Sequence, residues 1–227
     1  ANDITIKSNT VSDNNAGIFI STSDDSILSS NTIESQTTFG VYIIESERVK
    51  FKSNIVKNNN NDALTLSSGC DDSFIDNNTI KDNGQSSVGK AIKLFEVDGT
   101  IIYNNSILSN DYTGITIALS NSNFIVHNTI KSNGKYAISI TSDLTTSTNN
   151  TIKDNTINDN QDIAIYIDGI FTKIINNTIK YNDKDGIQIL ANGARTTIQQ
   201  NNFVDNKENA IHVIGNNVLV TSNTIDG

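Results

Sequence analysis

The sequence predicts an all-β protein, a solenoid of short parallel strands wound into about ten coils. Three observations lead to this fold: a repeat of 22 to 27 residues fills the chain, polar residues recur at fixed points of each repeat, and apolar residues alternate with a period of two. Alternation of period two is typical of strands, and repetition at this length is typical of stacked architectures. We therefore expect one domain, residues 1–227.

The first corner of each coil is predicted by an Asn that recurs in every repeat, with an apolar residue three positions before it and another two positions after it. The column is Asn9, Asn31, Asn54, Asn78, Asn105, Asn128, Asn155, Asn177, Asn201 and Asn223. Stacked Asn amides can bond to the coils above and below, and Asn tolerates the left-handed or bridge conformations of a tight bend. We expect a strand on each side of this corner and an Asn ladder at it.

The second corner is predicted by another polar column, five residues after the first. It consists of Asn14, Gln36, Asn59, Asn83, Asn110, Asn133, Asn160, Asn182 and Asn206. A small residue, an aliphatic residue, a variable residue and a second aliphatic residue follow, as in Gly114-Ile115-Thr116-Ile117. This pattern predicts a third strand in each coil, with its variable residue pointing outward.

Composition excludes several classes of protein. The absence of Pro fits strands that are central and must donate their N–H groups. A net charge of −9 argues against nucleic-acid binding, and no apolar run is long enough for membrane insertion. Cys70 has no partner for a disulfide, and His127 and His212 are far apart in coil order, so no metal site is expected from them.

The repeat resembles the parallel β-helix repeat of the pectin-lyase-like superfamily. The matching pattern is Ile-x-x-Asn-Thr-Ile-x-x-Asn followed by Gly-Ile-x-Ile, as in residues 125–140, and the resemblance covers almost the whole chain. It implies right-handed winding, without a helical cap in this sequence. Relatives of this kind include copper-site assembly proteins of the NosD type, alginate epimerases, polysaccharide lyases, phage tailspikes and surface adhesins. The repeat is therefore specific for fold but not for function.

The chain departs from the enzymes at the residues that would act. The Gly-His-Gly and Arg-Ile-Lys of polygalacturonases do not occur, and the Asp-Pro-His of epimerases cannot occur in a chain without Pro. By resemblance, ligands lie on the outward side of the third strand. Its outward column includes Phe19, Tyr42 and Tyr166, whose rings could stack on sugars. The alternative is a solvated sheet face made of good strand formers.

Two irregular segments, residues 84–89 and 141–149, border this face and provide the candidates for catalysis. Lys90 and Lys93 follow the first segment, and Tyr136 is expected two coils away. A lyase or epimerase acting on uronate glycans needs a base and a cationic group, which these three residues could supply. The alternative is that the lysines only solubilise the sheet.

Acidic residues gather in the turn after the third strand, where stacked carboxylates could bind Ca²⁺. They are Asp24, Asp25, Glu45, Glu47, Asp71, Asp72, Glu96 and Asp98. Their register drifts from coil to coil, so a solvated acidic edge is the competing interpretation. No other cofactor is expected.

The apolar pattern already includes Ile4 and still includes Ile225, without a cap at either end. We expect either a piece of a longer protein or ends that associate with other chains. The leading functional hypothesis is an extracellular or cell-surface rod, structural or adhesive, that contacts a polysaccharide or surface glycan. The alternatives are a lyase or epimerase and a fragment of a phage tailspike.

Overall fold

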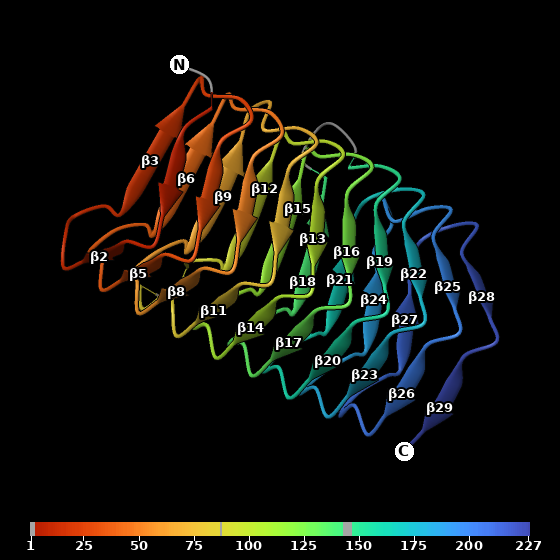
Figure 1. Cartoon of the computed structure of the whole chain (residues 1–227). Helices are drawn as coiled ribbons and strands as arrows, with labels where there is room; N and C mark the ends of the chain where they lie inside the picture. The colour runs from red at the N-terminus through yellow and green to blue at the C-terminus, as the bar shows by residue number, and fades with distance from the viewer. Residues whose placement is uncertain (1–2, 87, 143–146) are drawn as a thin grey trace.

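The computed structural model describes residues 3–86, 88–142 and 147–227. These residues form 29 strands in three parallel sheets, which we call sheets A, B and C, and contain no helix. Hence no helix in the described ranges is long and apolar enough to cross a membrane. The chain visits the three sheets in turn and advances by one coil each time (Figure 1).

Sheet A contains β1 (Thr5–Lys7), β4 (Ile27–Ser29), β7 (Lys50–Lys52), β10 (Phe74–Asp76), β13 (Ile101–Tyr103), β16 (Phe124–Val126), β19 (Thr151–Lys153), β22 (Lys173–Ile175), β25 (Thr197–Gln199) and β28 (Leu219–Thr221). Sheet B contains β2 (Thr10–Ser12), β5 (Thr32–Glu34), β8 (Ile55–Lys57), β11 (Thr79–Lys81), β14 (Ser106–Leu108), β17 (Thr129–Lys131), β20 (Thr156–Asn158), β23 (Thr178–Lys180), β26 (Asn202–Val204) and β29 (Thr224–Asp226). Sheet C contains β3 (Ile18–Ser21), β6 (Val41–Ile44), β9 (Leu64–Ser67), β12 (Ile92–Phe95), β15 (Ile115–Ala118), β18 (Ile138–Thr141), β21 (Ile165–Ile167), β24 (Ile187–Ile189) and β27 (Ile211–Val213).

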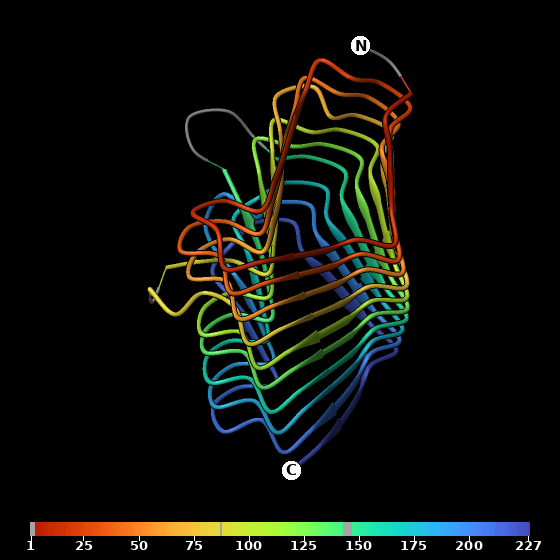
Figure 2. The same ribbon diagram turned by 60° about the vertical axis from the view of Figure 1, so that its left-hand side comes forward.

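The coils stack in register along the whole described chain. Two sheets have ten strands and the third has nine, which gives nine complete coils and part of a tenth. Figure 2 shows the coils lying one on another from the N-terminal to the C-terminal end. The predicted all-β parallel solenoid is thus confirmed.

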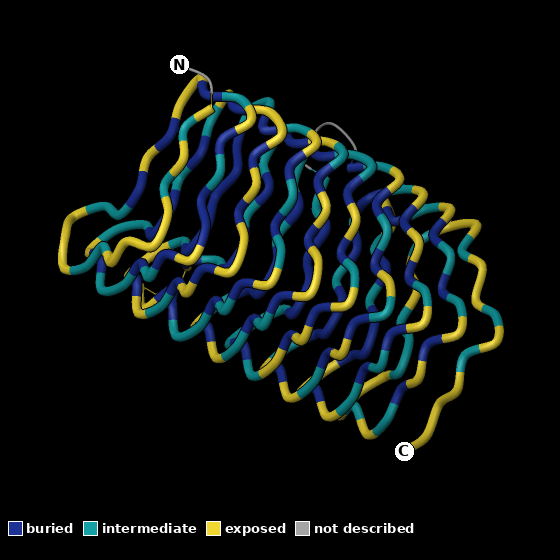
Figure 3. Tube along the Cα trace, in the orientation of Figure 1, coloured by how far each residue is buried: buried dark blue, intermediate teal, exposed yellow. Residues whose placement is uncertain are grey.

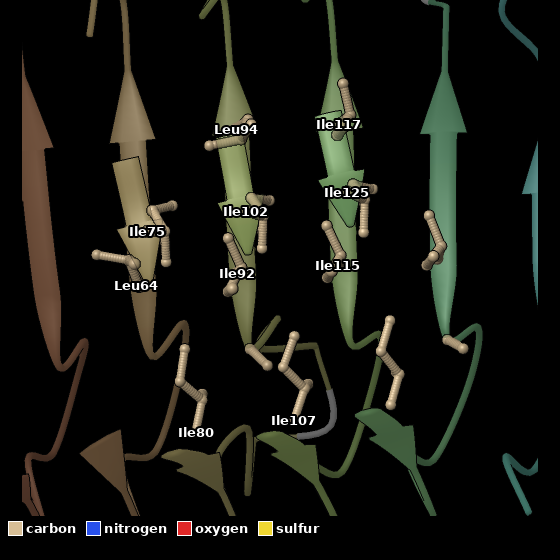
Figure 4. Close-up of a cluster of buried hydrophobic side chains, with 14 of the residues drawn as sticks. Leu64, Ile75, Ile80, Ile92, Leu94, Ile102, Ile107, Ile115, Ile117 and Ile125 are labelled. Carbon is tan, nitrogen blue, oxygen red and sulfur yellow. The ribbon is translucent and has the colours of Figure 1, made fainter. Parts of the chain in front are cut away.

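The core is a set of aliphatic columns inside the coils. Ile75 of sheet A pairs with Ile102, and Ile102 with Ile125, and all three are fully buried. Figure 4 shows these columns beside the inward residues of sheet C, such as Leu64, Ile92 and Ile115. Buried and exposed residues alternate along the strands, as the period of two predicted (Figure 3). Each buried Ile contributes about 1.5–3 kcal/mol, so the stacked columns hold the coils together.

The Asn ladder at the first corner connects each coil to two others. The Asn105 side chain donates from Nδ2 to Oδ1 of Asn128 (3.0 Å) and to the carbonyl of Ile75 (2.9 Å). Oδ1 of Asn128 also accepts the backbone N–H of Asn105 at 2.8 Å. The ladder residues from Asn31 to Asn201 are buried, so these bonds satisfy polar groups that water cannot reach. The predicted ladder is confirmed.

The bend itself comes from a neighbouring residue, which corrects one expectation. The left-handed conformation belongs to the residue before each ladder Asn, for example Ser53 (φ 56°) before Asn54 and His127 (φ 58°) before Asn128. No Asn of the ladder has a positive φ. The two tasks are therefore separate: the preceding residue turns the chain, and the Asn supplies the amide.

Candidate functional site

The outward column of sheet C forms a continuous row of side chains. Strand pairing sets Phe19, Tyr42, Thr65, Lys93, Thr116, Ser139, Tyr166, Gln188 and His212 in register on successive coils. Neighbouring strands lie about 4.8 Å apart, so the row is roughly 38 Å long. We call this row, together with the turns that lead into its strands, the sheet C face. It is long enough for several sugar units.

An aromatic cluster occupies the N-terminal end of the sheet C face. The rings of Phe19 and Tyr42 stack with their centroids 5.8 Å apart and an angle of 16° between their planes. Phe39, in the turn before β6, lies tilted against Tyr42 at 5.7 Å. Phe19 is 61% exposed, although its size favours burial, so this cluster presents an open ring surface to solvent.

Farther along the face, cations and aromatic rings alternate, and we call this set the cation–aromatic strip. Lys90 lies 5.5 Å and Lys135 4.6 Å from the ring centroid of Tyr112. The Lys135 ammonium also donates to the Tyr112 hydroxyl at 2.7 Å and lies 4.8 Å from the ring of Tyr136. Tyr136 in turn stacks on Tyr166 at 4.8 Å, with 10° between the rings.

The turns explain why these side chains meet. Tyr112 and Lys135 each stand two residues before the small residue that opens a sheet C strand, in neighbouring coils. The N–H of Lys135 donates to the carbonyl of Tyr112 at 3.0 Å, which fixes the two turns against each other. The hydrogen bond from Lys135 to Tyr112 raises the pKa of the lysine, and burial raises the pKa of Tyr166. At neutral pH Lys135 is therefore charged and Tyr166 is neutral.

The aromatic residues predicted to bind glycan fall into two places. Phe19 and Tyr42 are in contact, whereas Tyr166 belongs to the cation–aromatic strip. The positions between Tyr42 and Tyr166 on the outward column are not aromatic. They are Thr65, Lys93, Thr116 and Ser139. A role in glycan binding stays a prediction for all three aromatic residues.

The three residues predicted for catalysis are only partly brought together. Lys90 and Tyr136 are linked through Tyr112 and Lys135, which the sequence interpretation missed. The Lys93 ammonium lies over Phe95, at 5.6 Å from its centroid. Of the two irregular segments, residue 87 of the first and residues 143–146 of the second lie outside the described residues.

A second polar cluster, which we call the Asp185 cluster, occupies the C-terminal end of the face and was also missed. Asp185 is the only acidic residue among the buried ones that the structure describes. Its Oδ1 accepts from the backbone N–H of Asn209 (2.9 Å) and from the Asn209 side chain (2.7 Å). Its Oδ2 lies 3.1 Å from Nδ1 of His212 and 3.4 Å from Nε2 of Gln188. The His212 side chain remains 41% exposed.

The acidic turns after sheet C have a different character. Asp71 accepts the backbone N–H of Asp98 at 2.7 Å, and Asp98 accepts that of Asn121 at 2.6 Å. Asp25 pairs with Arg48 at 2.8 Å. The described residues hold no group of three or more His, Cys, Asp or Glu side chains arranged for a metal ion. Calcium binding at these turns stays a prediction.

A hollow of about 520 Å³ lies at the edge of the sheet C face, at the corner between sheets B and C. It is lined by Ser109, Asn110, Asp111, Ser132, Gly134 and Gln161. This lining has no aromatic ring and a single carboxylate, so we assign it no binding role.

Two family models match the chain. The model described as periplasmic copper-binding protein (NosD) matches residues 1–146, and the one described as right handed beta helix region matches residues 143–225. The second agrees with the right-handed winding that the resemblance implied. Comparison with curated proteins returns no match.

Several solved structures are similar over nearly the whole chain. The A-module of the mannuronan C-5 epimerase AlgE6 from Azotobacter vinelandii has a TM-score of 0.81 and 15% identity, covering 100% of this chain and 65% of that one. A double mutant of the periplasmic alginate epimerase AlgG has a TM-score of 0.70 and 16% identity, and the match covers 95% of this chain and 50% of that one. PfbA, a surface adhesin of Streptococcus pneumoniae, has a TM-score of 0.76 and 14% identity, and the match covers 98% of this chain and 69% of that one. The chain thus spans two thirds or less of either epimerase structure, and at such identities the likeness shows the fold alone.

Proposed function

The chain belongs to the NosD family, within the pectin-lyase-like superfamily of right-handed β-helices, and from that premise we propose that it binds an acidic polysaccharide. The ligand class is a polyuronate, which lies along the sheet C face across the coils. The chain works outside the cytoplasm, in the periplasm or at the cell surface. Binding without turnover makes it a structural or adhesive rod.

The observation that carries this proposal is the cation–aromatic strip. Tyr faces suit the flat apolar side of a sugar ring, and lysine ammonium groups suit carboxylates. In the described residues, Lys90, Lys93 and Lys135 have no carboxylate within ion-pair distance. Since the chain has a net charge of −9, such unpaired cations give an anionic polymer a local place to bind.

The similar structures support the ligand class. Two of them are described as epimerases of mannuronan or alginate, and a third as a surface adhesin. All three share the fold of this chain, with TM-scores of 0.81, 0.70 and 0.76. We carry over only the class of ligand, an acidic polysaccharide.

Copper, which the family description names, does not fit the side chains of this chain. Copper sites use His, Cys and Met, and this sequence has two His, one Cys and no Met. Cys70 is buried, burial raises the pKa of its thiol, and the thiol donates to the carbonyl of Ser67 at 3.1 Å. His127 contacts Tyr103 beside sheet A, whereas His212 lies on sheet C. We therefore derive no function through copper.

The test is the affinity of the chain for polymannuronate, measured by calorimetry beside a neutral glucan of equal length. We expect binding of the polyuronate alone, weakening as salt rises. The variant Lys90→Ala/Lys135→Ala should lose most of this affinity. Its control, Lys52→Ala/Lys173→Ala, removes the same charge from the outward face of sheet A. Equal effects of the two variants, or no binding by the natural chain, would overturn the proposal.

A further inference from the structure

Sheet A carries a patch of apolar side chains on its outward face, near the middle of the stacked coils (Figure 1). Ile101 (38% exposed), Tyr103 (38%) and Phe124 (42%) belong to neighbouring strands, and strand pairing places Phe74 and Val126 beside them. The rings of Phe74 and Tyr103 stack with their centroids 6.3 Å apart. We call these five residues the sheet A patch. Contiguous apolar surface of this kind is typical of an interaction site.

The corner that leads into sheet A changes its charge from one end of the chain to the other. Two residues of each coil form this corner, and the second of them has a positive φ, as in Asp72 (φ 53°) and Ser122 (φ 56°). Each of the first five coils has at least one carboxylate at these two positions, and none of the last five has any. The carboxylates are Asp3, Asp24, Asp25, Glu47, Asp71, Asp72 and Asp98, and the guanidinium groups are Arg48 in the first half and Arg195 in the second.

The outward residues of the sheet A strands reduce this difference without reversing it. The first half adds Lys7, Lys50, Lys52 and Asp76, and the second half adds Lys153 and Lys173. Asp154, at the far corner of the sheet, lies 3.5 Å from Lys153. The outward face of sheet A is therefore acidic on balance before the sheet A patch and basic on balance after it.

A second copy of this chain complements such a face. A two-fold axis parallel to β13, passing over Ile101, turns the coils of the second copy antiparallel to those of the first. Ile101 then meets its own copy, and Phe74 lies opposite Phe124 of the second copy. The same rotation places Lys173 opposite the coil of Asp24, so that unlike charges meet at both ends of the contact. A parallel pair would bring the two acidic halves together, and an anionic lipid surface would meet the acidic half.

The area of overlap is large enough for a specific dimer. Antiparallel pairing about β13 overlaps the sheet A strands from β1 to β25. With about 4.8 Å between strands and about 3.3 Å per residue over a strand and its corners, the overlap measures roughly 43 by 16 Å. Two copies would bury about 1,400 Å² in total, which lies within the range of specific protein interfaces.

We propose that the outward face of sheet A is an interface between two copies of this chain, which pair antiparallel about a two-fold axis at Ile101. The sheet A patch forms the apolar centre of the contact, and charges of opposite sign meet on either side of it. Since the contact uses sheet A, the sheet C face of each copy stays open. This inference is therefore independent of the proposed function, and a dimer would present two polymer sites.

The first test is the molar mass of the whole chain in solution, measured by light scattering from about 1 to 500 μM. We expect the mass to rise from that of one chain to that of two. Ile101→Lys places two ammonium groups at the two-fold axis and should raise the dissociation constant by at least about 30-fold. The control is Ile55→Lys, which makes the same change at the equivalent outward position of sheet B, where Ile55 is 41% exposed. It should leave the dissociation constant unchanged, and both variants should keep the melting temperature of the natural monomer.

The second test concerns the antiparallel orientation. Lys173 forms no ion pair with the described residues of its own copy, so its charge is available to the other copy. Lys173→Glu should weaken the dimer by about 10-fold, because two carboxylate coils then face each other. Adding Asp24→Lys to Lys173→Glu should restore part of the loss. In a parallel pair these two positions would be far apart, and the second change would restore nothing.

Three results would overturn the proposal. The first is a mass of one chain at every concentration. The second is an equal effect of Ile101→Lys and Ile55→Lys on the dimer, which would place the interface elsewhere. The third is a monomeric chain that sediments with phosphatidylglycerol vesicles and loses this binding in Ile101→Lys, since the sheet A patch would then serve a lipid surface. A dimer that Lys173→Glu leaves unchanged would overturn the antiparallel arrangement.

Discussion

The two edges of sheet C both stack charged side chains, yet those side chains have different partners. On the edge where the chain leaves the sheet, Asp71 and Asp98 accept backbone N–H groups of the next coil. On the edge where it enters, Lys90 and Lys135 lie against the ring of Tyr112, and no backbone carbonyl accepts from their ammonium groups in the described residues. A row of like charges therefore does not by itself reveal whether the charges stabilise the fold or are available to a ligand.

A structural charge differs from a charge that is available to a ligand in the partner that it contacts. A carboxylate that satisfies a backbone amide contributes to stability and is already engaged. A lysine held by an aromatic ring keeps its charge without a counter-ion and can still meet an anion. Mutations on the edge where the chain leaves sheet C (the exit edge) should thus lower stability. Mutations on the edge where it enters (the entry edge) should lower polyuronate affinity.

The largest expected effect is that of Tyr112→Ala on polyuronate affinity. The change removes the ring between Lys90 and Lys135 and the hydroxyl that accepts from Lys135. Each cation–ring contact is worth about 0.5–2 kcal/mol, so we expect a loss of about 10- to 100-fold in affinity by calorimetry. The control is Tyr181→Ala, because Lys180 lies 5.5 Å from that ring on another face. Equal losses in both variants would remove the distinction between the faces.

The next effect is on stability, at the exit edge. Asp98→Ala leaves the N–H of Asn121 without its acceptor, and should lower the free energy of unfolding by about 1 kcal/mol in a urea titration. Polyuronate affinity should not change. Asp98→Asn keeps an acceptor oxygen and should be close to neutral. If Asp98→Asn costs as much as Asp98→Ala, the charge of Asp98 matters more than its hydrogen bond.

A smaller effect distinguishes the two aromatic clusters of the sheet C face. Tyr42 contacts Phe19 and Phe39, and no cation contacts its ring in the described residues. Tyr42→Ala should lower polyuronate affinity by about two- to fivefold, since one ring contact is lost. Salt titrations of polyuronate binding separate the cases: the loss caused by Tyr42→Ala should be the same at low and high salt, and the loss caused by Tyr112→Ala should shrink as salt rises. A salt-dependent effect of Tyr42→Ala would contradict this division.

The fold was readable from the sequence because each coil repeats the same physical demands. Asn128 and Ile130 recur in equivalent form in every coil, so register followed from counting. The residue that makes the bend was harder to predict. The left-handed position is occupied by Ser, Asn, Asp and even His127, because the preference for a particular residue type there is weaker than the demand for an aliphatic residue in the core.

The site was harder to predict because its residues do not recur from coil to coil. Tyr112 and Lys135 stand at the same turn position of neighbouring coils, but the residue type at that position varies along the chain, so nothing in the pattern marked them as a site. Asp185 was missed for another reason. His212 and Asp185 are 27 residues apart in the sequence, so their contact follows only from the stacking of coils. Since Gln188 and His212 are in register, counting coils could have placed Asp185 beside His212.

The smallest expected effect is a pH dependence that differs between the two edges. A hydrogen bond from Arg48 lowers the pKa of Asp25 from its ordinary value of 3.8. The pair therefore stabilises the chain above pH 3.8, and this contribution is lost as pH falls further through the lowered pKa. The melting temperature of Arg48→Gln should differ slightly from that of the natural chain at neutral pH, and the difference should vanish in strong acid.

The entry edge should show the opposite window. The pKa of Lys135 is raised above its ordinary value of 10.5, first by its hydrogen bond to Tyr112. Its contact therefore contributes fully below pH 10.5 and is lost as pH rises through the raised pKa. The melting temperature of Lys135→Met should differ from that of the natural chain at neutral and acidic pH, and the difference should disappear in alkali. If both variants lost their effect at the same end of the pH scale, the two edges would not be held by the distinct partners described above.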